Sequence, residues 1–224
     1  MSGFRFPARV QKLRERLAKD DLEAIFITNG ENRRYASGFV STAGYLMVTA
    51  DEAVICTDFR YIELAAQQAP GWRIDRIGGK PDWLAKLVNE FEIKTLGFEA
   101  DDMTVSTLER FKKALKENDA DPEWKSTSGI GVDLRAYKDA GELELLQRAI
   151  DIGDQAFEET AAQLEVGMTE KEAAWIFEKA VRERGAESIS FETIVAIGPN
   201  AARPHHATSD SKLVEGQTIV FDCG

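Results

Sequence analysis

The segment LEAIFITNG, residues 22–30, carries the pattern that decides the fold of the N-terminal part of the chain. It is a short apolar run closed by Asn29-Gly30, which is typical of a buried strand followed by a turn. Before it, Val10, Leu13 and Leu17 recur at helical spacing in a segment that opens at Pro7, a favourable residue for a first helical turn. The sequence therefore predicts a helix followed by a buried strand.

The alternation of strand and helix patterns continues to residue 118. Two apolar runs, Tyr45–Thr49 and Ala53–Thr57, are separated by Ala50-Asp51-Glu52 and predict a hairpin. Beyond them the pattern predicts, in order, a helix at 61–69, a strand at 72–77, a helix at 82–91, a strand at 95–99 and a helix at 104–118. Such alternation favours an α/β layer architecture with a mixed sheet.

A polar, glycine-containing stretch at 126–129 marks a change in character, and it divides the chain into domains at 1–132 and 133–224. A long amphipathic helix is expected from Asp139 to Leu164. Its apolar face holds Leu143, Leu146, Ile150, Gly153, Phe157 and Leu164. Thr169 then begins a second helix, with Glu172 placed to complete a capping box. Strands are expected at 191–197 and 217–222, on either side of the polar loop 198–210.

Composition excludes several classes of protein. The 224 residues carry a formal net charge of −11, which argues against sequence-independent binding to nucleic acid or to anionic lipid. The first twenty residues hold no apolar core of a signal peptide, and no stretch is long enough for a membrane span. The two cysteines, Cys56 and Cys223, have no metal-ligand spacing and build no disulfide framework. We therefore expect a cytoplasmic protein that binds neither nucleic acid nor membrane.

Three residues of the C-terminal part could carry chemistry. His205 and His206 are adjacent in the loop between two apolar strands, where a neutral histidine could donate a hydrogen bond to a substrate carbonyl. The structural alternative is a pair of exposed loop histidines. Asp222 ends an apolar strand and could be a metal ligand, or it could cap the following turn. From these residues alone both alternatives stay open.

Two segments add a resemblance to a known family. The stretch FETIVAIGPNAARPHH, residues 191–206, resembles the substrate-histidine loop of Xaa-Pro aminopeptidases and prolidases. The stretch EGQTIVFDCG, residues 215–224, is similar to the strand that bears the first metal-ligating Asp of that family. Weaker matches are in family order: residues 32–39 and 57–63 resemble the creatinase-type N-terminal domain, and residues 138–143 and 167–170 resemble the entries to the first two pita-bread helices.

The resemblance implies a fold and a set of roles. It implies a creatinase-type N-terminal mixed-sheet domain followed by the first half of an α+β pita-bread domain. His205 matches the catalytic histidine that contacts substrate, His206 is a second, lower-ranked substrate-binding residue, and Asp222 matches the first metal ligand. The implied activity is hydrolysis of Xaa-Pro bonds in proline-containing peptides by a homodimer, with two divalent ions (manganese, cobalt or zinc) that activate a water.

The sequence also departs from the family pattern. The second Asp, the ligand His and both Glu of the family's metal site would lie beyond Gly224, so we expect a partial sequence that neither binds two metals tightly nor hydrolyses peptides by itself. Three alternatives remain: a creatinase-like amidinohydrolase that uses histidine without metals, a non-catalytic pita-bread module for binding or assembly, and an N-terminal domain that acts alone in dimerisation. The expected bare apolar strands are an aggregation hazard.

Overall fold

A computed structural model describes residues 6–224. The chain forms two compact units, Met1–Lys138 and Asp139–Gly224. The division falls a few residues after the boundary at 132/133 that the sequence suggests. The reason is α6 (Ile130–Ala136), whose Ile130 is buried in the core of the first unit and whose Leu134 carbonyl accepts a hydrogen bond from the Tyr35 hydroxyl.

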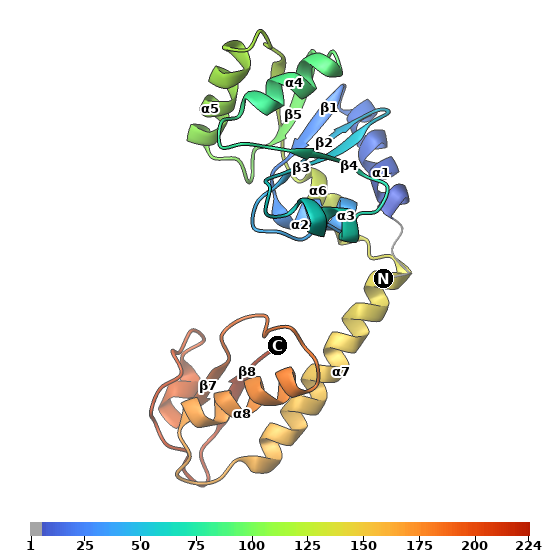
Figure 1. The fold of residues 1–224 in the computed structure, drawn as a ribbon. Helices are drawn as coiled ribbons and strands as arrows, with labels where there is room; N and C mark the ends of the chain where they lie inside the picture. Colours follow the sequence, from blue (N-terminus) through green and yellow to red (C-terminus); the bar gives the residue numbers. More distant parts are fainter. Residues whose placement is uncertain (1–5) are drawn as a thin grey trace. The chain divides into compact units, whose positions relative to one another are not determined.

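The first unit is built on a six-stranded mixed sheet (Figure 1), as the sequence predicts. Its strands are β1 (Ala24–Ile27), β2 (Tyr45–Thr49), β3 (Ala53–Thr57), β4 (Arg73–Arg76), β5 (Thr95–Glu99) and β6 (Glu123–Thr127). They lie in the order β4-β3-β2-β1-β5-β6. β1 runs antiparallel to β2 and parallel to β5, and the hairpin of β2 and β3 is confirmed.

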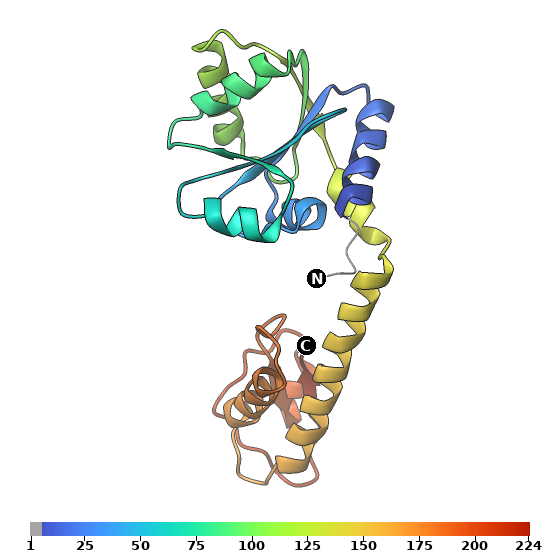
Figure 2. The same cartoon turned by 45° about the vertical axis from the view of Figure 1, so that its right-hand side comes forward.

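Helices cover both faces of this sheet, as Figure 2 shows. They are α1 (Phe6–Lys19), α2 (Gly30–Ser37), α3 (Ile62–Gln68), α4 (Asp82–Glu90), α5 (Val105–Lys116) and α6. The residues of β1 alternate between two cores: Ala24 and Phe26 pack with α4 and α5, whereas Ile25 and Ile27 pack with α1, α2, α3 and α6. Burial on both faces explains why residues 24–27 form an uninterrupted apolar run.

Besides α6, two elements of the first unit differ from the sequence prediction. Asn29-Gly30 does not close a turn but begins α2, because the Asn29 side chain caps the helix by accepting from the Asn32 backbone amide at 3.0 Å. Residues 123–127 form the edge strand β6, paired in parallel with β5, although their sequence is polar. Polar and charged side chains are common on edge strands, because they discourage the unpaired backbone edge from pairing with another chain.

The second unit consists of α7 (Ala140–Gln163), α8 (Glu170–Glu183) and the antiparallel strands β7 (Ile194–Ile197) and β8 (Ile219–Asp222), with the 3-10 helix η1 (Gly198–Ala202) after β7. The two long helices and the capping box of Thr169 and Glu172 are confirmed. Phe177 is fully buried in the small core, where its ring meets that of Phe221 at a centroid distance of 5.9 Å. The residues of this core come from α7, α8, β8 and the segments next to them.

The predicted apolar face of α7 is only partly covered. Leu143 is 57% exposed, Leu146 45% and Ile150 53%. In the helix itself, only Ala156 and Thr160 are buried. Within residues 6–224, other side chains therefore pack only against the C-terminal half of α7, and the apolar residues of its N-terminal half are exposed.

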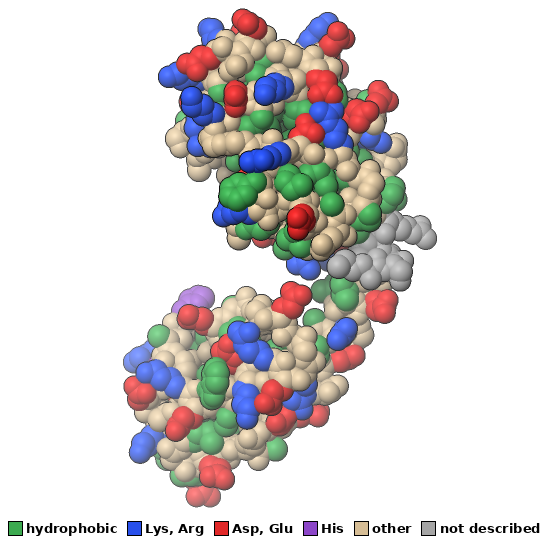
Figure 3. All heavy atoms as spheres, in the orientation of Figure 1, with side chains coloured by type: hydrophobic (Ala, Val, Ile, Leu, Met, Phe, Trp, Pro, Cys, Tyr) green, Lys and Arg blue, Asp and Glu red, His purple; other side chains and the backbone are tan. Residues whose placement is uncertain are grey.

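The surface of both units carries charges of both signs. On the face drawn in Figure 3, acidic and basic side chains are interspersed, and histidine atoms reach the surface of the second unit. Within residues 6–224, no helix has the length and hydropathy that a membrane crossing requires.

Candidate functional site

The candidate site is built around the long connection between β7 and β8, which contains both histidines. The connection starts with η1 and then turns back along β7, because the Thr208 hydroxyl accepts from the Val195 amide at 3.0 Å and donates to the Thr193 carbonyl at 2.9 Å. It then passes the start of α8, where Leu213 exchanges backbone hydrogen bonds with residues 167 and 168. The connection is therefore fixed at several points along its length.

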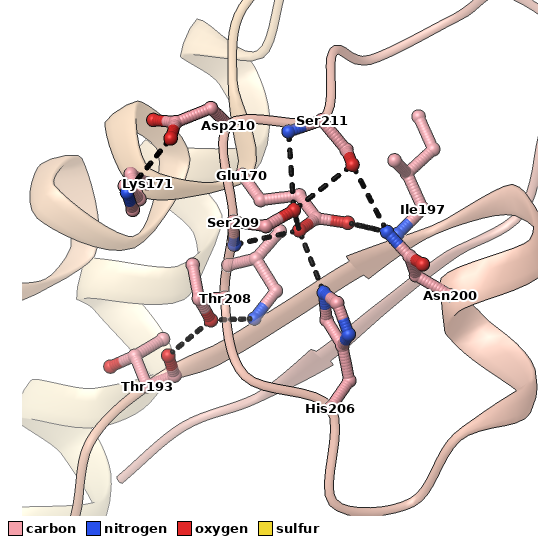
Figure 4. Close-up of polar contacts among 11 residues, drawn as sticks. Glu170, Lys171, Thr193, Ile197, Asn200, His206, Thr208, Ser209, Asp210 and Ser211 are labelled. Atoms are coloured by element: carbon pink, nitrogen blue, oxygen red, sulfur yellow. Dashed lines mark hydrogen bonds and ion pairs between the residues drawn. The ribbon is translucent and has the colours of Figure 1, made fainter.

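Glu170, the first residue of α8, is the centre of this arrangement (Figure 4). Its side chain is completely buried, and both carboxylate oxygens accept hydrogen bonds. Oε1 accepts from the Ile197 amide at 2.9 Å and from Nδ2 of Asn200 at 3.0 Å. Oε2 accepts from Nε2 of His206 at 2.8 Å and from the amide and hydroxyl of Ser209 at 2.9 and 2.7 Å. Five donors, all from β7 and its following loop, thus converge on one buried carboxylate.

These hydrogen bonds keep Glu170 ionised. Burial acts to raise the pKa of Glu170, but the hydrogen bonds from Ser209, Asn200, His206 and Ile197 outweigh it and hold this pKa at about 2. The position at the N-terminus of α8 also favours a negative charge. An ionised carboxylate can only accept hydrogen bonds, so the hydrogen lies on Nε2 of His206, and this Nε2–H donates the hydrogen bond to Glu170.

The two adjacent histidines have different environments. The side chain of His206 is 8% exposed and is directed at Glu170, whereas His205 is exposed. The His206 amide donates to the Arg203 carbonyl at 3.1 Å, so residues 203–206 form a turn with Pro204 and His205 at its centre. His205 is therefore exposed on a turn whose last residue, His206, is held by its hydrogen bond to Glu170.

Asp222, the third residue singled out from the sequence, is the last residue of β8 and is exposed. In the strand register it lies opposite Ile194, at the end of β7 where Thr208 returns to contact Thr193 and Val195. Among residues 6–224, however, no three His, Cys, Asp or Glu side chains are grouped so that they could hold a metal ion. Asp222 could supply one carboxylate ligand, but the described residues do not form a complete donor set for a divalent ion.

The sequence did not reveal the role of Glu170. A glutamate directly after the helix-capping Thr169 is expected to face solvent and to interact with the positive end of the helix. Its burial follows from the loop, whose contacting residues lie 27 to 39 positions further along the chain. The only local signal was the polar composition of the loop, because its serines, threonines and asparagine need buried acceptors when the loop packs against α8.

Comparison with known proteins covers nearly the whole chain. The family model "Creatinase/Prolidase N-terminal domain" matches residues 9–137, and the model "Metallopeptidase family M24" matches residues 144–224. A Bacillus subtilis peptidase, YqhT, is 33% identical over 217 residues, which make up 96% of this chain and 60% of that protein.

Solved structures give the same result. The Xaa-Pro dipeptidase from Bacillus anthracis matches with a TM-score of 0.92 and 35% identity, over 98% of this chain and 61% of that one. The X-Pro aminopeptidase from Thermotoga maritima matches with a TM-score of 0.86 and 32% identity, over 96% and 60%. The chain therefore spans about 60% of the length of the relatives it matches.

Proposed function

The chain belongs to the creatinase/prolidase family, and on this premise we propose that the protein it represents hydrolyses Xaa-Pro peptide bonds. Both units contribute to the premise, since the N-terminal model and the metallopeptidase model match in family order. The named relatives include both a dipeptidase and an aminopeptidase, so the proposal covers proline-containing peptides of either length. The proposed protein is a cytoplasmic homodimer.

One observation carries the proposal: an exposed histidine is presented by a loop that a buried carboxylate holds in place. His205 is the exposed member of the pair and is the residue proposed to meet substrate, where it would donate a hydrogen bond near the scissile carbonyl. Proline suits such a site because its tertiary amide has no N–H and its ring fixes the backbone, so a shaped pocket can recognise it.

Metal chemistry enters this proposal only through the family. Members of the M24 metallopeptidase family use divalent ions, and manganese, cobalt or zinc would supply an activated water. Asp222 is the proposed first ligand from this chain. Because the described residues do not complete a donor set, we do not expect residues 1–224 alone to hydrolyse peptides.

The test uses the product of the complete reading frame that encodes this chain. We expect it to cleave an Xaa-Pro dipeptide or a longer Xaa-Pro peptide in the presence of Mn²⁺, Co²⁺ or Zn²⁺, and to lose activity with a chelator. His205→Ala should lower kcat by about a hundredfold or more, the usual range for a catalytic proton donor. Lys179→Ala, an exposed change on α8, is the matched control.

Failure to cleave any Xaa-Pro bond with all three ions would refute the proposal. Hydrolysis of creatine in place of peptides would favour the amidinohydrolase alternative. Light scattering of the same protein in solution tests the homodimer.

A further inference from the structure

The hydrogen bonds of Glu170 connect α8 to the loop that carries His205. All five donors come from Ile197 at the end of β7 or from the loop after it. A buried ionised carboxylate is strongly unfavourable unless it is fully hydrogen-bonded, so the five donors cannot move away independently. Glu170 therefore restrains the loop on both sides of His205, through Asn200 before it and through His206 and Ser209 after it.

The turn at residues 203–206 relates this restraint to the direction of His205. Pro204 fixes its own backbone angle at the second position of the turn, which is a favoured position for proline. His206 closes the turn with its amide, and its ring is held by Glu170 at 2.8 Å. His205 thus lies between a rigid proline and an anchored histidine, and its side chain is exposed.

We propose that Glu170 is a positioning residue, which acts through His206 to fix the direction in which the turn presents His205. The inference rests on the proposed function, in which His205 meets the substrate. It assigns His206 a positioning role instead of direct contact with substrate, because its Nε2–H already donates a hydrogen bond to Glu170 and its side chain is only 8% exposed.

A purely structural role for Glu170 makes a different prediction. If Glu170 only stabilised the second unit, its loss would reduce the amount of folded enzyme, and that reduction would multiply with the effect of any change at His205. A positioning residue acts through His205, so its loss has no further effect once the His205 side chain has been removed.

The kinetic test uses the complete reading-frame product with Glu170→Gln, alone and combined with His205→Ala. We expect Glu170→Gln to lower kcat by about tenfold to a hundredfold with little change in KM, since small misplacements of a reacting group have effects of this size. In the His205→Ala background the same change should have no measurable effect. Equal reductions in both backgrounds would overturn the inference.

Two variants of His206 and a matched acid make the test specific. His206→Gln retains an N–H donor for Glu170 and should keep most of the activity, whereas His206→Ala should behave like Glu170→Gln. Glu172→Gln removes an acid from the same helix turn. The Glu172 carboxylate accepts hydrogen bonds from Thr169 and, within residues 6–224, from no residue of the loop, so this change should leave kcat unchanged. Loss of activity in His206→Gln equal to that in His206→Ala would contradict the positioning role.

A second measurement decides the inference even if the protein does not cleave Xaa-Pro bonds. The chain has only two histidines, so ring resonances in the NMR spectrum of residues 1–224 report directly on His205 and His206. In Glu170→Gln we expect faster exchange of the His206 ring N–H and a changed His205 ring signal, because the turn is released. A His205 signal that does not change would overturn the inference. Should Glu170→Gln fail to fold, His206→Ala leaves four donors on Glu170 and provides the same comparison.

Discussion

The buried charge of Glu170 predicts a distinctive dependence of stability on pH. Hydrogen bonds hold the pKa of this carboxyl at about 2 in the folded chain, compared with an ordinary value of 4.5. Because the folded pKa is the lower one, the stabilisation is fully present above pH 4.5 and is lost as the pH falls toward 2. At about 1.4 kcal/mol for each tenfold change in proton affinity, the ionised carboxylate contributes about 3 kcal/mol to the second unit at neutral pH.

Glu170→Gln isolates this contribution, because glutamine is neutral at every pH. We expect the difference in unfolding free energy between the wild-type chain and Glu170→Gln to be largest above pH 5. It should shrink by about 2 kcal/mol by pH 3, since most of the linkage lies between the two pKa values. The same backbone and side-chain donors are present in both proteins, so the change between pH 5 and pH 3 reports the ionisation of Glu170 together with its contact to His206.

Urea titrations followed by the histidine ring signals provide the assay, because both histidines lie in the second unit. Glu172→Gln is the control: hydrogen bonds from Thr169 lower the pKa of Glu172 as well, but solvent screens this exposed group, and its difference from wild type should vary less with pH. A difference between wild type and Glu170→Gln that stays constant from pH 6 to pH 3 would refute the reasoning.

Three further substitutions test the packing of each unit. Phe177→Ala should destabilise the second unit by about 3–5 kcal/mol, because a fully buried ring is lost; a urea midpoint equal to that of wild type would contradict this. Gly131→Ala should destabilise the first unit by about 1–3 kcal/mol, because the new Cβ would collide with the Asn32 side-chain amide. Urea titrations followed by tryptophan fluorescence measure this change, and Gly79→Ala, which adds a Cβ in open space, is the control. Leu146→Gln, on the exposed face of α7, should change the free energy of unfolding by less than about 0.5 kcal/mol and should reduce the binding of an apolar dye. Unchanged dye binding would show that this face is not exposed in solution.

The sequence by itself determined most of the secondary structure and the family. The apolar run at 22–28 predicted a buried strand, and the observed β1 is a strand buried on both faces. The capping box of Thr169 and Glu172 likewise located the start of α8. The polar edge strand at 123–127 and the helix that begins at Gly30 escaped prediction, because neither carries a strong apolar period.

The tertiary structure alone decided how the candidate site is organised. The sequence singled out His205, His206 and Asp222, but it could not distinguish the exposed histidine from the one bound to Glu170. Periodicity and capping are local signals, and they report on neighbours within about four residues. The partners of a buried carboxylate lie wherever the chain returns, and in this protein His206 lies 36 positions after Glu170. Only the packing of the loop onto α8 brings the two together, so the different environments of the two histidines follow from the fold and not from the motif that contains them.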